Sequence, residues 1–179
     1  MNIVPDSKDW TWVLHSACPE CGLDTRQLPR EGVAGLLRAN AGRWLVVLDH
    51  SVVRDRPAPG VWSPLEYACH VRDVFLRFAQ RLDLMLTEQD PLFPNWDQDA
   101  TAIEQRYDRQ DPAEVARELS EAAETLAIAF EQVSGPLWER TGRRSDGASF
   151  TVETFGRYFI HDPIHHLYDV TGRRHGEEG

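Results

Sequence analysis

The sequence contains no long run of apolar residues, and a membrane-spanning helix requires one. No window approaches the ~20 uninterrupted apolar residues that cross a bilayer. Residues 1–6 also lack the basic and apolar regions of a signal peptide. We therefore expect a cytoplasmic protein with no membrane partner.

Blocks of basic residues are missing as well. The chain has 19 Lys and Arg residues against 29 Asp and Glu residues, a formal net charge of −10, and basic residues occur at most two in a row. A surface of this sign repels the phosphate backbone of nucleic acids. We expect no nucleic-acid partner.

Cysteine is scarce. The chain has 3 cysteines, an odd number, in a sequence without an export signal. Disulfide frameworks are typical of exported chains with even cysteine counts. The cysteines therefore indicate a reducing compartment and reduced thiols.

The composition that remains is that of a folded domain. Among 179 residues, 41% are hydrophobic and 27% are charged, as in one soluble globular domain that can bury a core without a structural metal. Residues 1–29 stand apart, because a short apolar stretch around Trp10 and Trp12 is followed by Cys18-Pro19-Glu20-Cys21 and a polar run. We predict an N-terminal arm over residues 1–29 and a helical domain over residues 30–179.

Helical periodicity and capping residues predict four long helices in that domain. Ser63, Pro64 and Glu66 form a capping-box start, Asp111 and Pro112 form another, and Thr151 and Gly172 bound the last helix. The expected helices span about 31–54, 63–89, 111–133 and 151–171, and the connections 90–110 and 135–150 are long. No strand is expected. The fold class is all-α, a four-helix bundle whose long connections allow a topology other than simple up-and-down.

Histidines at helical spacing form the clearest chemical pattern. His161 and His165 are four residues apart, so they project from one face of the last helix, and His70 lies near the inward face of the second helix. Three His ligands with one open position are typical of catalytic zinc. Pro163 lies between the paired histidines, and we predict one kinked helix there. A hydrogen-bonded role in the core is the alternative for each histidine.

Two segments resemble a known family. The stretch 62–73, with Trp-Ser-Pro before a Glu and then His70, and the stretch 159–172, with His-Asp-Pro-Ile-His-His, resemble the DinB-like superfamily. The resemblance implies a four-helix bundle, a homodimer, and a divalent metal held by His70, His161 and His165, with zinc favoured and nickel or iron as alternatives. It also implies a small-molecule substrate and a low-molecular-weight thiol as co-substrate.

Characterised members of that family are mostly thiol-dependent S-transferases and a mycothiol-dependent maleylpyruvate isomerase. The resemblance therefore suggests a thiol S-transferase or isomerase of the mycothiol type. The chemistry is coherent, because a metal keeps a thiol deprotonated at neutral pH. Two alternatives remain open: a metal-dependent hydrolase, since zinc also lowers the pKa of water, and a non-catalytic metal-binding or dimerisation module.

The arm carries a second cluster. Cys18 and Cys21 have the spacing of half a zinc knuckle, and His15 could add a third ligand, although a fourth is missing. A second metal, a structural turn with reduced thiols, and thiol redox chemistry are all possible interpretations. Cys69, next to His70, is expected to pack in the core.

Other polar residues near the histidines have supporting roles or none. Glu66, Asp73, Asp162 and Asp169 are candidates for orienting a ligand imidazole, with solvated surface acids as the alternative. Arg72, Arg157 and Tyr158 are candidates for holding an anionic co-substrate, with surface charge and packing as the alternative. His50, His166 and His175 are assigned to surface or packing.

Overall fold

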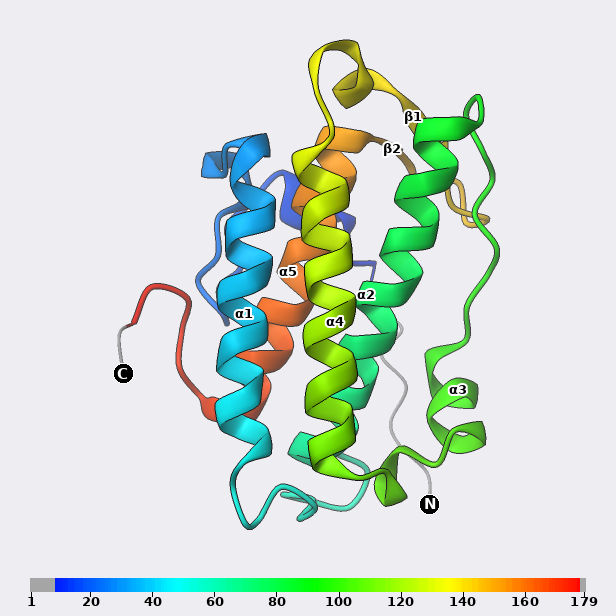
Figure 1. Cartoon of the computed structure of the whole chain (residues 1–179). Coiled ribbons are helices and arrows are strands. Elements are labelled where there is room, and N and C mark those ends of the chain that lie inside the picture. Colours follow the sequence, from blue (N-terminus) through cyan, green and yellow to red (C-terminus); the bar gives the residue numbers. More distant parts are fainter. Residues whose placement is uncertain (1–8, 178–179) are drawn as a thin grey trace.

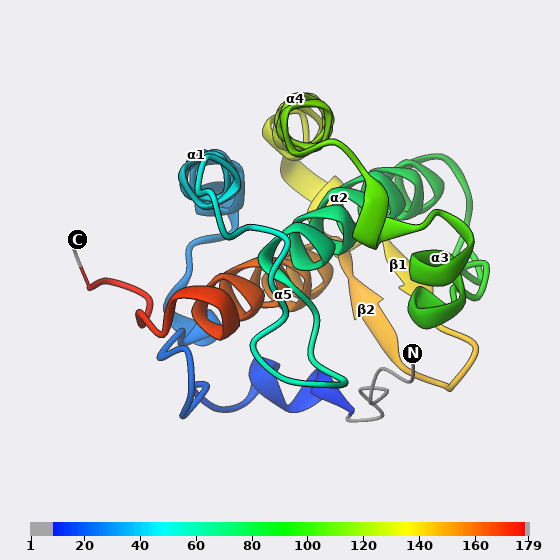
Figure 2. The ribbon, with the colours of Figure 1, turned by 90° about the horizontal axis from the view of Figure 1, so that it is seen from below.

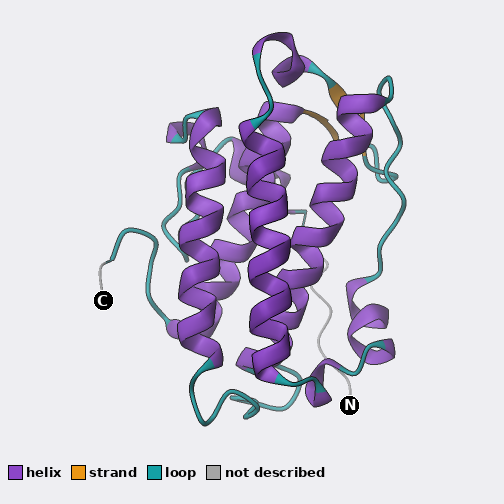
Figure 3. Cartoon of the chain, in the orientation of Figure 1, coloured by secondary structure: helices purple, strands orange, loops and turns teal. Residues whose placement is uncertain are grey.

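Four long helices form the frame of the computed structural model, which describes residues 9–177 (Figures 1 and 3). They are α1 (Val33–Leu48), α2 (Pro64–Thr87), α4 (Pro112–Glu131) and α5 (Val152–Thr171). The all-α bundle expected from the sequence is confirmed. None of the helices within residues 9–177 is long and apolar enough to cross a membrane.

Helix boundaries follow the capping residues. Ser63 Oγ accepts a hydrogen bond from the backbone N–H of Glu66, and the Glu66 carboxylate accepts one from the N–H of Ser63, which completes the capping box of α2. Thr151 caps α5, and Gly172 ends it with a φ of 68°. Pro163 lies inside α5, which is continuous through it.

The bundle does not follow a simple up-and-down order. Each of α1 and α2 packs between α4 and α5, so α1 and α2 lie diagonally across the bundle (Figure 2). In Figure 1, α1 and α5 run downward and α2 and α4 run upward. The long connections make this possible, because a diagonal step cannot be made by a tight turn.

Aromatic rings fill the space between α2 and α5. The ring centroids of Phe78 lie 4.8 Å from those of both Phe155 and Phe159, and Phe75 lies 6.0 Å from Phe159. Each such ring stabilises the fold by about 1.5–3 kcal/mol when fully buried. This packing fixes the rotation of α5 about its own axis, which decides where its polar residues point.

The first helix is shorter than its apolar pattern predicts. It ends at Leu48 rather than near residue 54, and turns follow, with the N–H of Val53 donating to the carbonyl of His50. Val53 is buried and Val52 is 59% exposed. The turn after α1 buries Val53, and this buried apolar residue extends the helix-like spacing in the sequence beyond the end of the helix.

Two connections hold elements that were not expected. The segment 90–110 contains α3 (Gln98–Glu104), capped by Asp97. The connection before α5 contains a hairpin of β1 (Thr141–Arg143) and β2 (Ser149–Thr151). Strands of three residues are too short to show an alternating pattern, which is why the expectation of no strand was wrong.

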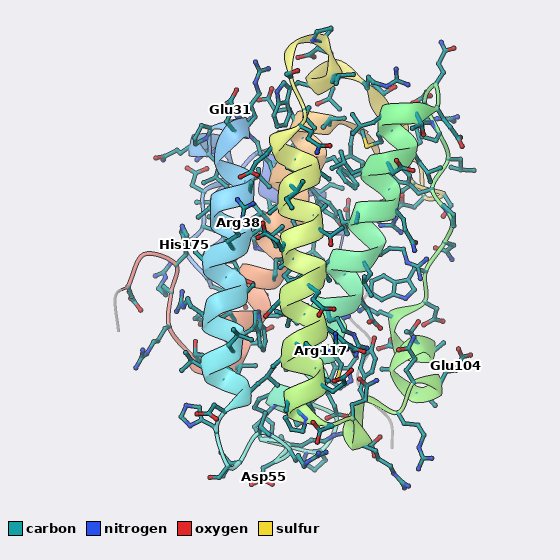
Figure 4. All side chains as sticks on the ribbon, viewed as in Figure 1. Glu31, Arg38, Asp55, Glu104, Arg117 and His175 are labelled. Atoms are coloured by element: carbon teal, nitrogen blue, oxygen red, sulfur yellow. The ribbon has the colours of Figure 1, made fainter. Side chains whose placement is uncertain are left out.

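The arm lies along α5 on the side away from α4 (Figure 2). It consists of short 3₁₀ turns at Trp10–Leu14, Thr25–Gln27 and Arg30–Gly32. The Arg157 guanidinium on α5 donates to the carbonyl of Leu28 at 3.0 Å. On the opposite surface, Arg38 of α1 forms exposed ion pairs with acids of α4 (Figure 4), a kind of contact that adds little stability.

Candidate metal centres

Four adjacent polar positions on α5 build two groups of potential metal ligands. His161 and His165 are one helical turn apart, and so are Asp162 and His166. Successive residues on a helix point about 100° apart. The first pair therefore faces the N-terminal arm, while the second faces α2.

The first group, which we call the histidine–aspartate site, consists of His70, Asp162 and His166. One ligand atom from each lies within 4.8 Å of the others. His70 Nε2 is 3.8 Å from Asp162 Oδ1, and His166 Nε2 is 3.8 Å from Asp162 Oδ2. Both separations are longer than a hydrogen bond, and the three side chains face a common space.

Among the three residues, His70 is the one with two buried polar atoms that lack hydrogen-bond partners within residues 9–177. Its side chain is 1% exposed, and neither ring nitrogen has a hydrogen-bond partner among residues 9–177. The ring lies 5.2 Å from Trp62 and stacks at 5.6 Å on Trp96. A buried imidazole without a partner is costly, and a cation held with Asp162 would give one nitrogen its partner.

Neighbouring side chains favour the metal-binding form of the other two residues, His166 and Asp162. His166 Nδ1 lies 3.0 Å from Asp169 Oδ2, which orients the ring and leaves Nε2 toward Asp162. Burial on its own would raise the pKa of Asp162, but the imidazoles of His166 and His70 outweigh it and lower that pKa to about 2. Asp162 is therefore an anion at neutral pH, the form that binds a cation.

The second group, which we call the cysteine–histidine site, consists of Cys18, Cys21, His161 and His165. All four residues are buried, and one ligand atom from each lies within 4.8 Å of the others. Cys18 Sγ is 3.6 Å from His165 Nδ1. His161 Nε2 has no hydrogen-bond partner in the described part of the chain.

Burial controls ionisation in this second group. It lowers the pKa of His161 to about 4, helped by the nearby His165, and it also lowers the pKa of His165. Both imidazoles are therefore neutral at pH 7, as metal ligands must be. Burial raises the pKa of Cys21 to about 12, and it does the same for Cys69. Such thiols are poor nucleophiles by themselves.

A cavity of about 460 Å³ adjoins both groups. The α5 residues of the two sites form one of its walls. The rest of the lining comes from the arm, α2, the 90–110 segment, the hairpin and Tyr158 of α5. It combines aromatic, basic and acidic side chains, among them Trp10, Phe78, Arg81, Phe93, Trp96, Asp97, Asp99, Arg144 and Asp146. A volume of this size suits a small-molecule ligand.

Arg81 places one positive charge in a cavity lining that also contains several aspartates. Its guanidinium packs 5.5 Å from the ring of Phe93, and its buried Nε has no hydrogen-bond partner within residues 9–177. Burial lowers the pKa of Arg81 to about 10, so the side chain stays charged at neutral pH. Arg144, beside it in the lining, already pairs with Asp146. Arg81 is thus the group that can receive an anion.

The structure does not bring the three predicted histidines into one group. His70 joins Asp162 and His166, whereas His161 and His165 join the two cysteines. The physical reason is the rotation of α5, which turns the 162/166 face toward α2. His166 was assigned to surface or packing, although the spacing of Asp162 and His166 offered the same signal as the histidine pair.

The predicted second cluster also differs in membership. His15 is exposed, while Cys18 and Cys21 are buried against His161 and His165. The two cysteines thus gain two candidate ligands from α5, far along the sequence, in place of His15 and the missing fourth ligand.

Of the other candidates for orienting a ligand imidazole, two have different partners and one contacts His166. Glu66 pairs with Arg56, and Asp73 accepts from Tyr107. Asp169 does contact a ligand imidazole. Neither Glu66 nor Asp73 therefore serves as the partner of His70.

The residues proposed for an anionic co-substrate are also divided. Arg72 pairs with Asp73 and Glu118, and Arg157 binds the arm, so both have other partners. Tyr158 lines the cavity, as expected for such a role. Arg81 was not identified from the sequence, because an isolated arginine in a helix gives no pattern.

Comparison with known proteins gives two matches. The model of the DinB superfamily matches residues 35–170. YfiT from Bacillus subtilis, described as a probable metal-dependent hydrolase with an unusual four-helix bundle topology, has a similar structure, with a TM-score of 0.69, 20% identity, and 88% of each chain covered. No curated protein matches. The matched range begins after the arm that carries Cys18 and Cys21.

Proposed function

The chain belongs to the DinB superfamily, and we propose that it is a divalent metal-dependent enzyme whose active centre is the histidine–aspartate site. The observation that carries the proposal is His70, an almost fully buried imidazole with both nitrogens unpartnered among residues 9–177, facing Asp162 and His166. Two imidazoles and one carboxylate are a donor set that suits zinc, iron or nickel and leaves coordination positions open.

The residues around this site have defined tasks in such an enzyme. A bound divalent cation would act as a Lewis acid that keeps a thiol or a water deprotonated at neutral pH. Asp169 holds the Nδ1 proton of His166 and so fixes which nitrogen faces the metal. Trp62 and Trp96 enclose the His70 ring and exclude water from it. Arg81 holds an anionic part of the substrate in the cavity.

We propose a thiol S-transferase as the reaction class, with a low-molecular-weight thiol as co-substrate. The thiol loses its proton to solvent, its sulfur forms a bond to an electrophilic carbon of the second substrate, and the leaving group departs with the electron pair of the broken bond. The cavity supports this choice, because it can hold a small molecule with a carboxylate or other anionic group at Arg81. Hydrolysis is the second candidate, favoured by the description of YfiT.

The test compares the two reactions on the same metal-loaded protein. We expect turnover of an electrophile with a panel of thiols that includes mycothiol, bacillithiol and glutathione, and its loss in the His70→Ala variant. His50→Ala is the matched control, since His50 is exposed and remote from the cavity lining. Turnover of ester or amide substrates without thiol would favour the hydrolase. Equal activity in His70→Ala and wild type would contradict the proposal.

Arg81 offers a test of substrate charge. Replacing Arg81 by Gln removes one charge-assisted contact, worth roughly 1.5–3 kcal/mol, so KM for an anionic substrate should rise by about 10- to 100-fold. Arg117→Gln, an exposed change on α4 (Figure 4), is the control and should leave KM unchanged. An unchanged KM in Arg81→Gln would show that the anion lies elsewhere.

A further inference from the structure

We propose that Cys18, Cys21, His161 and His165 bind a second metal ion, a structural zinc that fastens the N-terminal arm to α5. The four residues come from two parts of the chain, the arm and the last helix, and they are all buried. The site is separate from the histidine–aspartate site, because it uses the other face of α5.

The donor set and its spacing suit zinc. A Cys-x-x-Cys pair combined with a His-x-x-x-His pair is a ligand pattern of closed zinc sites, and thiolate sulfur favours zinc over magnesium or calcium. With Zn–S at about 2.3 Å and Zn–N at about 2.0–2.1 Å, tetrahedral coordination places sulfur and nitrogen about 3.6 Å apart. Cys18 Sγ and His165 Nδ1 are 3.6 Å apart.

The backbone of the arm is shaped to present both sulfurs to one point. The N–H of Gly22 donates to the carbonyl of Cys18 at 3.0 Å, and the N–H of Cys18 donates to the carbonyl of Leu23 at 2.9 Å. Gly22 has a φ of +81°, which a side chain would make unfavourable. This tight turn holds Cys18 and Cys21 on the same side.

The segment after α5 contacts the turn that contains Cys18 and Cys21 through two hydrogen bonds. Arg174 donates to the carbonyl of Pro19 at 3.0 Å, and the N–H of His175 donates to the carbonyl of Cys21 at 2.7 Å. The cysteine turn is therefore enclosed between α5 and the C-terminal segment. Such a site holds its ion firmly, because exchange would require both segments to move.

The surroundings of the two imidazoles also suit a bound ion. His165 Nε2 lies 3.4 Å from a Glu20 carboxylate oxygen and 3.6 Å from Asp169 Oδ1, which leaves Nδ1 toward Cys18. A carboxylate behind a ligand imidazole is the usual support for metal-bound histidine. His161 Nε2, buried and unpartnered within residues 9–177, would gain its missing partner from the ion.

The ion would also shape the cavity. Trp10 lies in the arm ahead of the cysteines, with its ring 5.3 Å from His161 and 4.8 Å from His165, and it lines the cavity. A zinc that holds the arm on α5 therefore holds one wall of the cavity in place. Four protein ligands leave no open position, so the role of this ion is structural.

The test uses the full-length protein with cobalt(II) in place of zinc. Cobalt bound to two thiolates gives a strong thiolate-to-cobalt charge-transfer band and intense visible absorption, whereas cobalt bound only by imidazole and carboxylate gives no thiolate band. We expect the band in wild type and in the Cys69→Ala control, and its complete loss in Cys18→Ser/Cys21→Ser. Replacing His70 and His166 together by Ala should leave the band unchanged.

Each outcome decides between the two sites. A wild-type spectrum without the thiolate band overturns the proposal whether or not the double-cysteine variant folds. A band that persists in Cys18→Ser/Cys21→Ser also overturns it, since another thiol must then be the ligand. Loss of the band in the His70/His166 variant, with the fold intact by circular dichroism, would show one shared site and would overturn the separation of the two ions.

Discussion

The two candidate metal centres share one helix and differ in what lies opposite them. Asp162 and His166 face α2, where His70 completes a set of three ligands beside the cavity. His161 and His165 face the arm, where two cysteines complete a set of four. Two pairs of residues on α5 have the same spacing of four and are offset by one position. One pair contributes to the three-residue group and the other to the four-residue group. The facing segment determines which kind of site forms.

Burial sharpens the contrast. All four residues of the cysteine–histidine site are buried, whereas Asp162 and His166 are half-buried at the cavity wall. A metal with three protein ligands keeps positions at which small molecules can exchange, whereas a metal with four buried protein ligands does not. We therefore propose that the histidine–aspartate site is catalytic and that the cysteine–histidine site holds the N-terminal arm on α5.

The largest expected effect is the separation of the two sites by chelation. A moderate chelator should remove the exposed metal first, abolishing activity while one zinc per chain and the helical circular dichroism signal remain. The reason is access, since two of the three residues of the histidine–aspartate site are half-buried, whereas all four residues of the cysteine–histidine site are buried. Metal content, activity and helicity measured on the same sample check this. Simultaneous loss of both ions would contradict the distinction.

The next effect is on the arm. Replacing Cys18 and Cys21 by Ser should lower Tm by roughly 5–10 °C, as expected for a loss of a few kcal/mol in a chain of this size. It should also expose the bond after Arg26 to trypsin, since the arm is no longer held on α5. Cys69→Ala is the control for thiol loss. A variant with unchanged Tm and protease resistance would show that the arm is fixed by other contacts.

Asp169 lies between the two centres and should affect both by a smaller amount. Its carboxylate is 3.0 Å from His166 Nδ1 and 3.6 Å from His165 Nε2. Losing the carboxylate behind a ligand imidazole typically weakens metal binding by about 10- to 100-fold. Competition titrations of Asp169→Asn with a metal indicator should show weakening at both sites. Unchanged affinity at both sites would show that Asp169 supports neither imidazole.

Glu66 should have the smallest effect and none on metal. It is nearly fully buried; burial would raise its pKa, but Arg56 and the backbone of Ser63 outweigh this and lower it. A folded-state pKa below the unfolded value stabilises the fold above about pH 4.5, and this contribution is lost as pH falls through the folded value.

The measurement for Glu66 is a pair of unfolding curves. Glu66→Gln should cost roughly 1.5–3 kcal/mol at pH 7, the range for a hydrogen bond to a charged group. The difference from wild type should shrink below about pH 4.5. Metal content should stay at the wild-type value, because Glu66 pairs with Arg56 rather than with His70. A pH-independent difference would show that the ion pair is not its origin.

Local patterns in the sequence were enough to predict the helices, but they were not enough to predict which residues form each candidate site. Ser63 with Glu66, and Thr151 with Gly172, predict helix ends because capping depends on neighbours in sequence. The apolar spacing of α1 continues into a turn, and the strands of the hairpin before α5 have only three residues each. Neither the end of α1 nor the hairpin therefore has a local pattern that marks it.

The ligand types were visible in the sequence, but their grouping was not. The His161 and His165 spacing and the Cys18 and Cys21 spacing were each recognised, yet joining them requires knowing that the arm lies along α5. Choosing between His165 and His166 as the partner of His70 requires the rotation of α5, which the packing of its aromatic rings fixes. The sequence restricts the candidates, and the tertiary packing selects among them.

The most direct test of two separate centres is anomalous diffraction at the zinc edge from a crystal of the full-length protein grown with zinc. We expect two anomalous peaks per chain. One should lie among Cys18 Sγ, Cys21 Sγ and the imidazoles of His161 and His165, and the other among His70, Asp162 and His166. A single peak coordinated by His70, His161 and His165 together would contradict this expectation.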